Sequence, residues 1–297
     1  MYSSFSARAL GLSLSAVETI ELAATAGFGG VDFLLRDLRA EGADPKALRT
    51  RLDDRGLQAG AWALPVDWRG DADRFHADLA ELPRFAEAAA ILGATRTGTW
   101  VMPETPEPAG PGQDAASVYG ATMEWHCQRL GAIARILDDH GIQLGLEVIG
   151  VESSRPGRGL PFVTRLGDLN GVLRLLWPKA ANVGILVDGF HLYAAGEAME
   201  MGLHWGVDRV VWAHVADLPA ASPPDRRSIQ DHDRGLPGEN GAVESGRLLQ
   251  LLSQAGYSGP VTAEPLARCR SLAGRSAQDV ARLVASAMKS IWPRPTP

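Results

Sequence analysis

The sequence has few cysteines and no long apolar run. Its two cysteines, Cys127 and Cys269, lie far apart and show no CxxC spacing. This excludes a disulfide framework and fits a reducing compartment, so we expect a cytoplasmic protein. No run of about 18 apolar residues occurs. The N-terminal stretch carries Glu18 and Glu21 among its apolar residues, which is not typical of a signal peptide, so we expect no membrane association.

Lysine is also scarce, and negative charge outweighs positive charge. Lysine occurs only at positions 46, 179 and 289, so arginine supplies nearly all of the basic side chains. The net charge is −6 and the isoelectric point is near 5.7, which gives no basic footprint for nucleic acid. We expect a small-molecule substrate and no nucleic-acid partner. The number of subunits stays open, a homo-oligomer included.

What the sequence does contain is an alternation of short β-type runs with longer helical patterns. Eight runs have the length and the apolar or β-branched character of strands. They are Ser3–Arg8, Gly30–Leu34, Leu57–Leu64, Ala94–Val101, Ile142–Ile149, Asn182–Val187, Val210–Ala216 and Gly259–Ala263.

Helix signals lie between these runs. Ser15 with Glu18 three residues later forms a capping box, and Asp44 followed by Pro45 is typical of a helix start. The other predicted helices are Asp73–Leu92 with a kink at Pro83, a long helix ending at His140, Asp168–Trp177, Val243–Ala255 and Ala277–Ile291.

Strict alternation of strands and helices predicts a parallel sheet with right-handed crossovers. Eight such units that close on themselves form a (β/α)8 TIM barrel, which we expect over residues 1–297 as a single domain. The rival is a doubly wound open sheet. No GxGxxG follows the first strand and no P-loop lysine motif occurs, which weakens that rival.

Four consecutive predicted strands carry an ionisable side chain at their carboxyl ends. Because the carboxyl ends of barrel strands build the active site, these side chains are expected to converge. Taken alone, Asp188 is explained as well by a helix cap as by a role in an active site. Taken alone, His214 is more typical of a core histidine than of a ligand. A carboxylate within an apolar strand, in contrast, is costly unless it is paired or metal-bound. The four residues are Glu147, Asp188, His214 and Glu264.

Three carboxylates and one imidazole placed together would repel one another without a cation. A divalent metal resolves this repulsion. Oxygen ligands with one imidazole suit Mn²⁺ or Mg²⁺, with Co²⁺ and Zn²⁺ as alternatives. We therefore predict one divalent metal ion at this end of the barrel.

The sequence resembles the xylose isomerase-like TIM barrels, in particular the sugar phosphate isomerase/epimerase group. The likeness is carried by Glu147, by the D-G-F-H step from Asp188 to His191, by His214, and by the segment RGLPGENG followed by GYSGPVTAEP. The resemblance implies that Glu147, Asp188, His214 and Glu264 bind the metal.

The resemblance also implies a reaction. Members of that group isomerise or epimerise keto-sugars by removing a proton next to a carbonyl, through an enediolate that the metal stabilises. Glu147 and Glu264 would be the acid/base pair, and His191 and Arg234 would contact the substrate.

Three further side chains are candidates for substrate contact. Trp62 and Trp100 lie at predicted strand ends, where an aromatic face can stack on a sugar ring or simply pack in the core. Glu152, five residues after Glu147, is placed to reach a substrate hydroxyl.

Other functions stay open beside the isomerase. A dehydratase or lyase of the same group, acting on an inosose or a keto-glycoside, starts with the same proton abstraction. An endonuclease IV-like nuclease needs extra histidines near the third and fourth strands and a basic face, which this sequence lacks. A barrel that only binds a sugar is the non-catalytic alternative.

Overall fold

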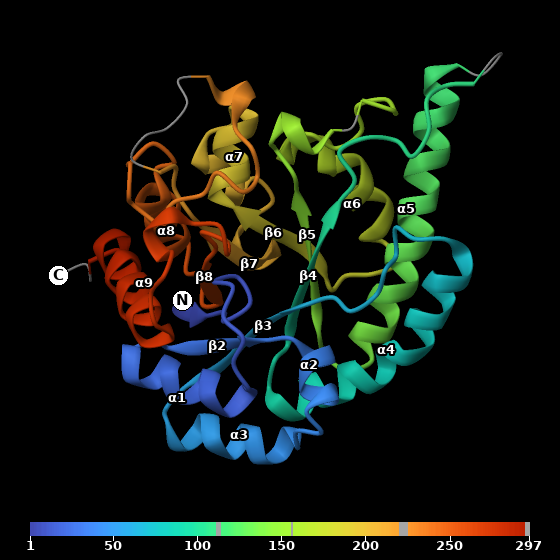
Figure 1. Ribbon diagram of the computed structural model, residues 1–297. Helices are drawn as coiled ribbons and strands as arrows, with labels where there is room; N and C mark the ends of the chain where they lie inside the picture. Colours follow the sequence, from blue (N-terminus) through green and yellow to red (C-terminus); the bar gives the residue numbers. More distant parts are fainter. Residues whose placement is uncertain (111–113, 156, 220–224, 295–297) are drawn as a thin grey trace.

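Eight parallel strands close into a barrel that is surrounded by helices (Figure 1). The computed structural model describes residues 1–110, 114–155, 157–219 and 225–294. Neighbouring strands follow chain order, and the first strand pairs with the last, so the predicted (β/α)8 TIM barrel is confirmed. The strands are β1 (Tyr2–Phe5), β2 (Gly30–Phe33), β3 (Gln58–Ala63), β4 (Arg96–Val101), β5 (Gln143–Val148), β6 (Val183–Asp188), β7 (Val210–Val215) and β8 (Pro260–Ala263).

The helices begin where the sequence offers caps. The side chains of Ser15 and Glu18 form the expected capping box, and Asp44 caps the helix that Pro45 opens. The helices are α1 (Ala16–Ala26), α2 (Leu35–Ala40), α3 (Pro45–Asp54), α4 (Ala72–Leu92), α5 (Ala115–Asp138), α6 (Asn170–Leu176), α7 (Gly189–Ala195), α8 (Ser245–Gln254) and α9 (Ala277–Ile291). The sequence did not predict α2 and α7, which are short.

The first strand is shorter than predicted. β1 ends at Phe5, and the chain then turns, with the Leu10 amide donating to the Ser6 carbonyl and the Leu12 amide to the Ala7 carbonyl. Local backbone bonding replaces strand pairing here. The turn places Arg8 in the loop after β1 rather than in the strand.

Two separate apolar clusters fill the molecule. The larger one lies mainly between the barrel and its helices, and the smaller one consists of Ala61, Leu186 and Trp212. Gly98 of β4 makes room for the smaller cluster, because a Cβ there would lie 2.7 Å from Cδ1 of Leu186 and 3.1 Å from Cε3 of Trp212. The indole of Trp212 therefore fits inside the barrel.

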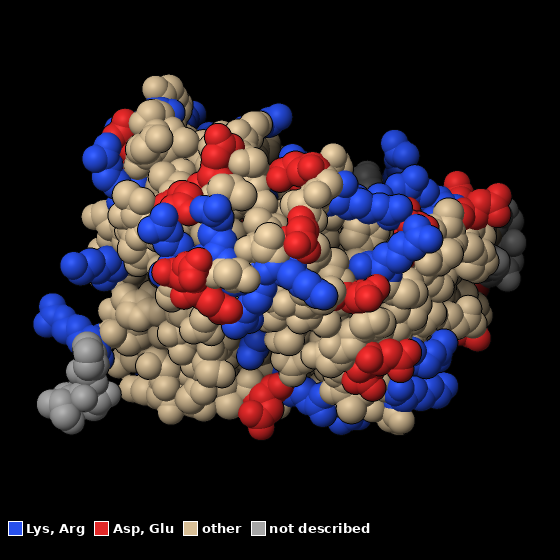
Figure 2. Space-filling model, turned by 90° about the horizontal axis from the view of Figure 1, so that it is seen from below, with Lys and Arg blue, Asp and Glu red and all other residues tan. Residues whose placement is uncertain are grey.

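Charge is mixed on the surface. Figure 2 shows basic and acidic side chains interspersed over the face that it displays. Over the residues described by the structure, no helix combines the length and apolarity needed to cross a bilayer.

Candidate active site

Four ionisable side chains from consecutive strands meet at the carboxyl end of the barrel. Each offers one ligand atom, and these atoms all lie within 4.8 Å of one another. The strand register explains the convergence, since Asp188 lies beside His214 on the neighbouring strand, and the Glu264 amide bonds to the Val215 carbonyl. We call this group the ligand cluster; it comprises Glu147, Asp188, His214 and Glu264.

The ligand cluster has the chemistry of a divalent-cation site. Oε1 of Glu147 and both ring nitrogens of His214 are buried, and within the described residues they have no hydrogen-bond partner. Nδ1 of His214 lies 3.6 Å from Oε1 of Glu147 and 3.3 Å from Oε2 of Glu264. A buried polar atom without a partner costs about 1–3 kcal/mol. A cation bound by these atoms would remove that cost, and the donor set fits a hard divalent ion.

Asp188 combines two roles that the sequence left as alternatives. Its Oδ1 accepts a 2.8 Å hydrogen bond from the Phe190 amide and so caps α7. Its Oδ2 accepts a 2.7 Å hydrogen bond from Nη1 of Arg234. The helix cap and the place in the ligand cluster do not exclude each other, because the carboxylate has two oxygens.

Arg234 joins the ligand cluster to the loop after β7. Its side chain is only 2% exposed, and Nη1 lies 3.2 Å from Oε2 of Glu264. Nη2 donates to Oδ1 of Asp231 at 2.7 Å and lies 3.1 Å from Nε2 of His191. A buried guanidinium is thus neutralised by several carboxylates, which raises the pKa of Arg234 even though burial acts in the opposite direction.

A short backbone bridge holds Arg234 in this position. Asp217 and Gly235 exchange two backbone hydrogen bonds, of 3.2 and 2.7 Å. A Cβ at Gly235 would lie 2.7 Å from the Leu218 carbonyl oxygen, so the close pairing needs glycine. The R-G step of the loop therefore directs the arginine back toward the barrel.

His191 is buried against the ligand cluster rather than on an open surface. It lies in the first turns of α7, is 4% exposed, and has Nε2 3.9 Å from Oδ2 of Asp188. Its Nδ1 has no hydrogen-bond partner among the described side chains and backbone. The imidazole is therefore held against Asp188 and Arg234 and does not face open solvent.

The two glutamates have pKa values displaced in opposite directions. Burial raises the pKa of Glu147. Burial acts in the same sense on Glu264, but the positive charges of His214 and Arg234 outweigh it, and the pKa of Glu264 lies below its usual range. The carboxylates in turn hold the pKa of His214 well above its ordinary value, against the effect of burial. Paired carboxyl groups with separated pKa values are typical of acid/base sites.

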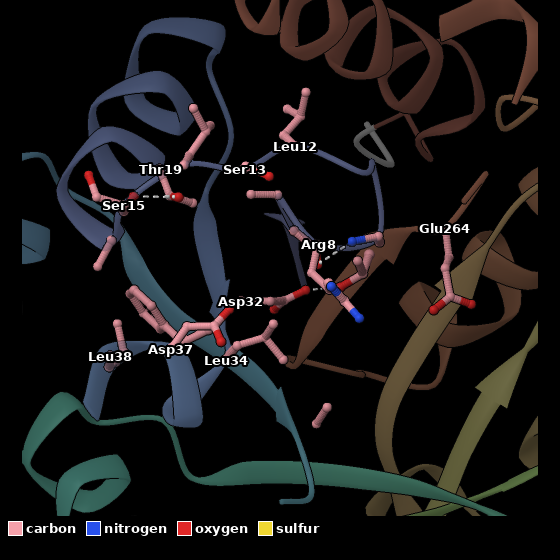
Figure 3. Close-up of a pocket in the computed structure, with 18 of the residues that line it drawn as sticks. Arg8, Leu12, Ser13, Ser15, Thr19, Asp32, Leu34, Asp37, Leu38 and Glu264 are labelled. Atoms are coloured by element: carbon pink, nitrogen blue, oxygen red, sulfur yellow. Dashed lines mark hydrogen bonds between the residues drawn. The ribbon is translucent and has the colours of Figure 1, made fainter. Parts of the chain in front are cut away.

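A cavity of about 820 Å³ opens beside the ligand cluster (Figure 3). His214 and Glu264 form part of its wall, and most of the other lining residues come from the loops after β1 and β2, from α1 and α2, and from the strands β2, β7 and β8. Among the described residues that line it, Arg8 is the only arginine or lysine. A cavity of this size fits a small polar molecule.

The two tryptophans predicted to contact substrate lie in different surroundings. Trp62 is fully buried in the larger apolar cluster, and its indole N–H donates to the Ala94 carbonyl at 2.9 Å. It has no free face for a sugar, so the prediction of stacking at Trp62 is corrected: it is a core residue. Trp100 is 39% exposed, with the guanidinium of Arg69 3.8 Å from its ring centre. Trp100 keeps an accessible surface.

Glu152 lies outside the ligand cluster. It begins a short 3₁₀ segment, Glu152–Ser154, and its half-exposed carboxylate lies 4.0 Å from Nε of Arg227. The structure brings Arg234 and His191 to the cluster but leaves Glu152 in the loop after β5.

Sequence reasoning missed several cavity residues on or next to the first two strands and the last two. Arg8, Asp32, Trp212 and Thr262 all line the cavity. Asp32 carried a signal that could have identified it, because it is an acid within the apolar strand Gly30–Leu34, as Glu147 is within its own strand. Arg8 had no such signal, since its place depends on where β1 ends.

Comparison with solved structures finds the same barrel in several proteins. A xylose isomerase domain protein from Alicyclobacillus acidocaldarius superposes with a TM-score of 0.81 at 27% identity, covering 97% of both chains. The IOLI protein with a bound zinc atom gives 0.77 at 16% identity over 98% of both chains. D-allulose 3-epimerase from a Methylomonas species, in complex with D-allulose, gives 0.67 at 18% identity over 98% of this chain and 97% of that one. The last two identities show the fold alone.

Sequence comparison gives the family. No curated protein matches the chain. The family model described as xylose isomerase-like TIM barrel matches residues 20–290, which include the whole ligand cluster. The chain therefore belongs to the xylose isomerase-like TIM barrel family.

Proposed function

We propose that this protein is a metal-dependent isomerase or epimerase of a keto-sugar or a related polyol ketone. One observation carries the proposal: three carboxylates and an imidazole from four adjacent strands place their ligand atoms within 4.8 Å, beside a cavity of about 820 Å³. The epimerase with the same fold supports this substrate class.

The metal would be held by Glu147, Asp188, His214 and Glu264. A divalent ion there, Mn²⁺ or Mg²⁺ by the oxygen-rich donor set, would act as a Lewis acid that polarises a substrate carbonyl. The orphaned nitrogens of His214 and the orphaned oxygen of Glu147 support this assignment.

Glu147 and Glu264 are the proposed acid/base pair. Both lie within 3.6 Å of the same His214 nitrogen, and their side chains, 13% and 22% exposed, are the more accessible ones of the ligand cluster. A substrate held between them presents the carbon next to its carbonyl to two carboxylates. One carboxylate takes the proton and the other returns a proton to the opposite face or to the neighbouring carbon.

Arg234 and His191 are proposed to hold substrate oxygens. Both are buried, and the hydrogen bonds of Arg234 to Asp188 and Asp231 fix its guanidinium before substrate arrives. A preorganised cation beside the acid/base pair would favour negative charge that develops on a substrate oxygen. Trp100 is retained as an accessible stacking surface, and Glu152 as a contact from the loop.

Proton exchange in D₂O tests this proposal. The protein loaded with Mn²⁺ or Mg²⁺ is incubated with ketoses, inososes and keto-glycosides, and deuterium uptake is followed by NMR. Uptake next to the carbonyl, with a new epimer or isomer, is the expected result. Loss of water with a conjugated enone would instead identify a dehydratase or lyase, and no exchange with any member of the panel would refute the proposal.

Metal stoichiometry is an independent check. One ion per chain, measured on reconstituted protein, is expected for a single site. Three zinc ions per chain would support the nuclease alternative, and the absence of any bound metal would contradict the mechanism.

A further inference from the structure

A second polar group lies inside the barrel, on strands β1, β2, β7 and β8. It consists of Ser4 of β1, Asp32 of β2, Thr262 of β8 and Trp212 of β7, and we call it the support cluster. All four side chains are buried, with exposed fractions from 1% to 8%. The metal ligands come from β5 to β8, so the two clusters share β7 and the end of β8.

Hydrogen bonds run through the support cluster in one direction. The indole N–H of Trp212 can only donate, and it lies 2.9 Å from Oγ1 of Thr262. Thr262 must then accept that bond, which leaves its own proton for Oδ2 of Asp32 at 2.5 Å. Asp32 is therefore the acceptor at the end of a chain that begins at the indole.

The carboxylate of Asp32 is fixed by two further donors. Its Oδ1 accepts from the Ser4 hydroxyl at 2.6 Å and from the Ala61 amide at 2.9 Å. The pairing of β2 with β3 shifts register between Val31 and Phe33, and the Ala61 amide lies at this irregularity. Three donors on one buried carboxylate hold it in a single orientation.

Glycine at position 60 makes room for this arrangement. A Cβ on Gly60 would lie 2.1 Å from Oδ1 of Asp32 and 2.3 Å from Oγ of Ser4. Gly98 likewise leaves room for Trp212. Glycine at both positions therefore lets the backbone approach the side chains of the support cluster closely. These close approaches distinguish it from a chance set of polar side chains.

The indole at the start of this hydrogen-bonded chain lies against a proposed metal ligand. The rings of Trp212 and His214 meet nearly at right angles, with centroids 4.4 Å apart and an interplanar angle of 83°. Both residues face the barrel interior two positions apart on β7. A change in the indole position would therefore change the orientation of the imidazole.

We propose that Asp32, acting through Thr262 and Trp212, is a positioning residue that orients His214 for metal binding. The inference rests on the proposed function, because it concerns the same metal site. Groups that orient a metal ligand commonly contribute 10- to 100-fold in metal affinity. Asp32 would exert this effect without touching the metal or the reacting atoms.

Replacement of Thr262 tests the proposal. Thr262→Val keeps the shape of the side chain and breaks the chain, whereas Thr262→Ser keeps the hydroxyl. Mn²⁺ affinity measured by titration calorimetry should fall about 10- to 100-fold in Thr262→Val and stay within about threefold in Thr262→Ser. Unchanged affinity in Thr262→Val would overturn the proposal.

Thr97→Val is the matched control. Thr97 is fully buried in β4 and donates to the Trp62 carbonyl at 2.7 Å, outside the support cluster. An equal loss of Mn²⁺ affinity in this variant would show that any disturbance of the barrel core weakens metal binding. That result would also overturn the proposal. If the wild-type protein binds no Mn²⁺, the proposed metal site falls, and this inference with it.

A second variant covers the case in which Thr262→Val does not fold, as judged by circular dichroism. Trp212→Phe keeps a ring against His214 but cannot donate to Thr262. Its Mn²⁺ affinity should fall several-fold. Wild-type affinity in this variant would contradict the role assigned to the hydrogen-bonded chain.

Discussion

Arg234 donates a 2.7 Å hydrogen bond to Asp188, and both side chains are almost completely buried. The same guanidinium nitrogen lies 3.2 Å from Glu264. Arginine and a metal ion would thus stabilise the same carboxylates. This gives Arg234 a structural effect that can be separated from substrate binding.

Arg234→Met should therefore destabilise the metal-free protein. Removing one member of a buried ion pair leaves an uncompensated charge, at a cost of about 3–5 kcal/mol. Because a metal ion can supply the missing positive charge, Mn²⁺ should raise the free energy of unfolding more in the variant than in the wild type. Urea unfolding with and without Mn²⁺ measures both effects, and equal stabilisation by Mn²⁺ would argue against shared carboxylates.

Glu264→Gln should abolish turnover while leaving the fold intact. The amide keeps the size of the side chain but cannot accept the substrate proton as a base. Circular dichroism should be unchanged, and deuterium exchange with the best substrate of the panel should be lost. Full activity in this variant would refute the role given to Glu264.

Arg8→Gln should weaken substrate binding and leave the metal site unchanged. Arg8 is the only arginine or lysine on the described cavity wall, so losing a hydrogen bond from its guanidinium to a bound substrate should raise KM about five- to tenfold. Mn²⁺ affinity should stay at the wild-type value. Arg247→Gln, which removes an exposed ion pair with Glu200 on elements that contribute no residue to the described cavity wall, is the control and should leave KM unchanged.

Trp62→Ala and Trp100→Ala should differ in what they damage. Trp62 is fully buried, so its truncation should cost about 3–5 kcal/mol of unfolding free energy. Trp100 is 39% exposed, so its truncation should have a small effect on stability and should raise KM instead. Denaturant unfolding and steady-state kinetics on both variants give the comparison, and a stable Trp62→Ala protein would contradict the core assignment.

His126 should make the protein sensitive to acid. Burial lowers the pKa of His126 to about 4, from an ordinary value of 6.5. At pH 7 the imidazole is neutral in both the folded and the unfolded chain. Between pH 6.5 and 4 the unfolded chain takes up a proton that the folded chain does not, so stability falls with pH by up to about 3 kcal/mol.

The variant His126→Phe removes this proton uptake. Its ring can occupy the same aromatic surroundings of Trp68, Trp125 and Phe162. Urea unfolding from pH 7 to 4 should show a shallower loss of stability in the variant than in the wild type. Parallel curves for the two proteins would contradict the assignment.

Much of the barrel could be predicted from the sequence because its determinants are local. A capping box at Ser15 needs only Glu18, and each strand is recognised from a few neighbouring residues. The ligand cluster followed from one rule of the fold, since an acid or histidine at the carboxyl end of each of four successive strands must converge once the strands close.

The direction in which an individual side chain points was harder to predict from the sequence. Trp62 and Trp100 look alike in the sequence, yet one packs in the core and the other keeps 39% of its surface exposed. Strand side chains alternate between faces, so an uncertainty of one residue in a strand reverses the prediction.

The sequence by itself determined the order of strands and helices, and with it the four residues at the carboxyl end. Only the tertiary structure decided that Asp32 meets Thr262, a residue 230 positions away, and that Arg8 lines the cavity. These contacts depend on the closure of β1 onto β8, on the register shift between β2 and β3, and on the room left by Gly60. Each is a property of strands packed together, which no local pattern encodes.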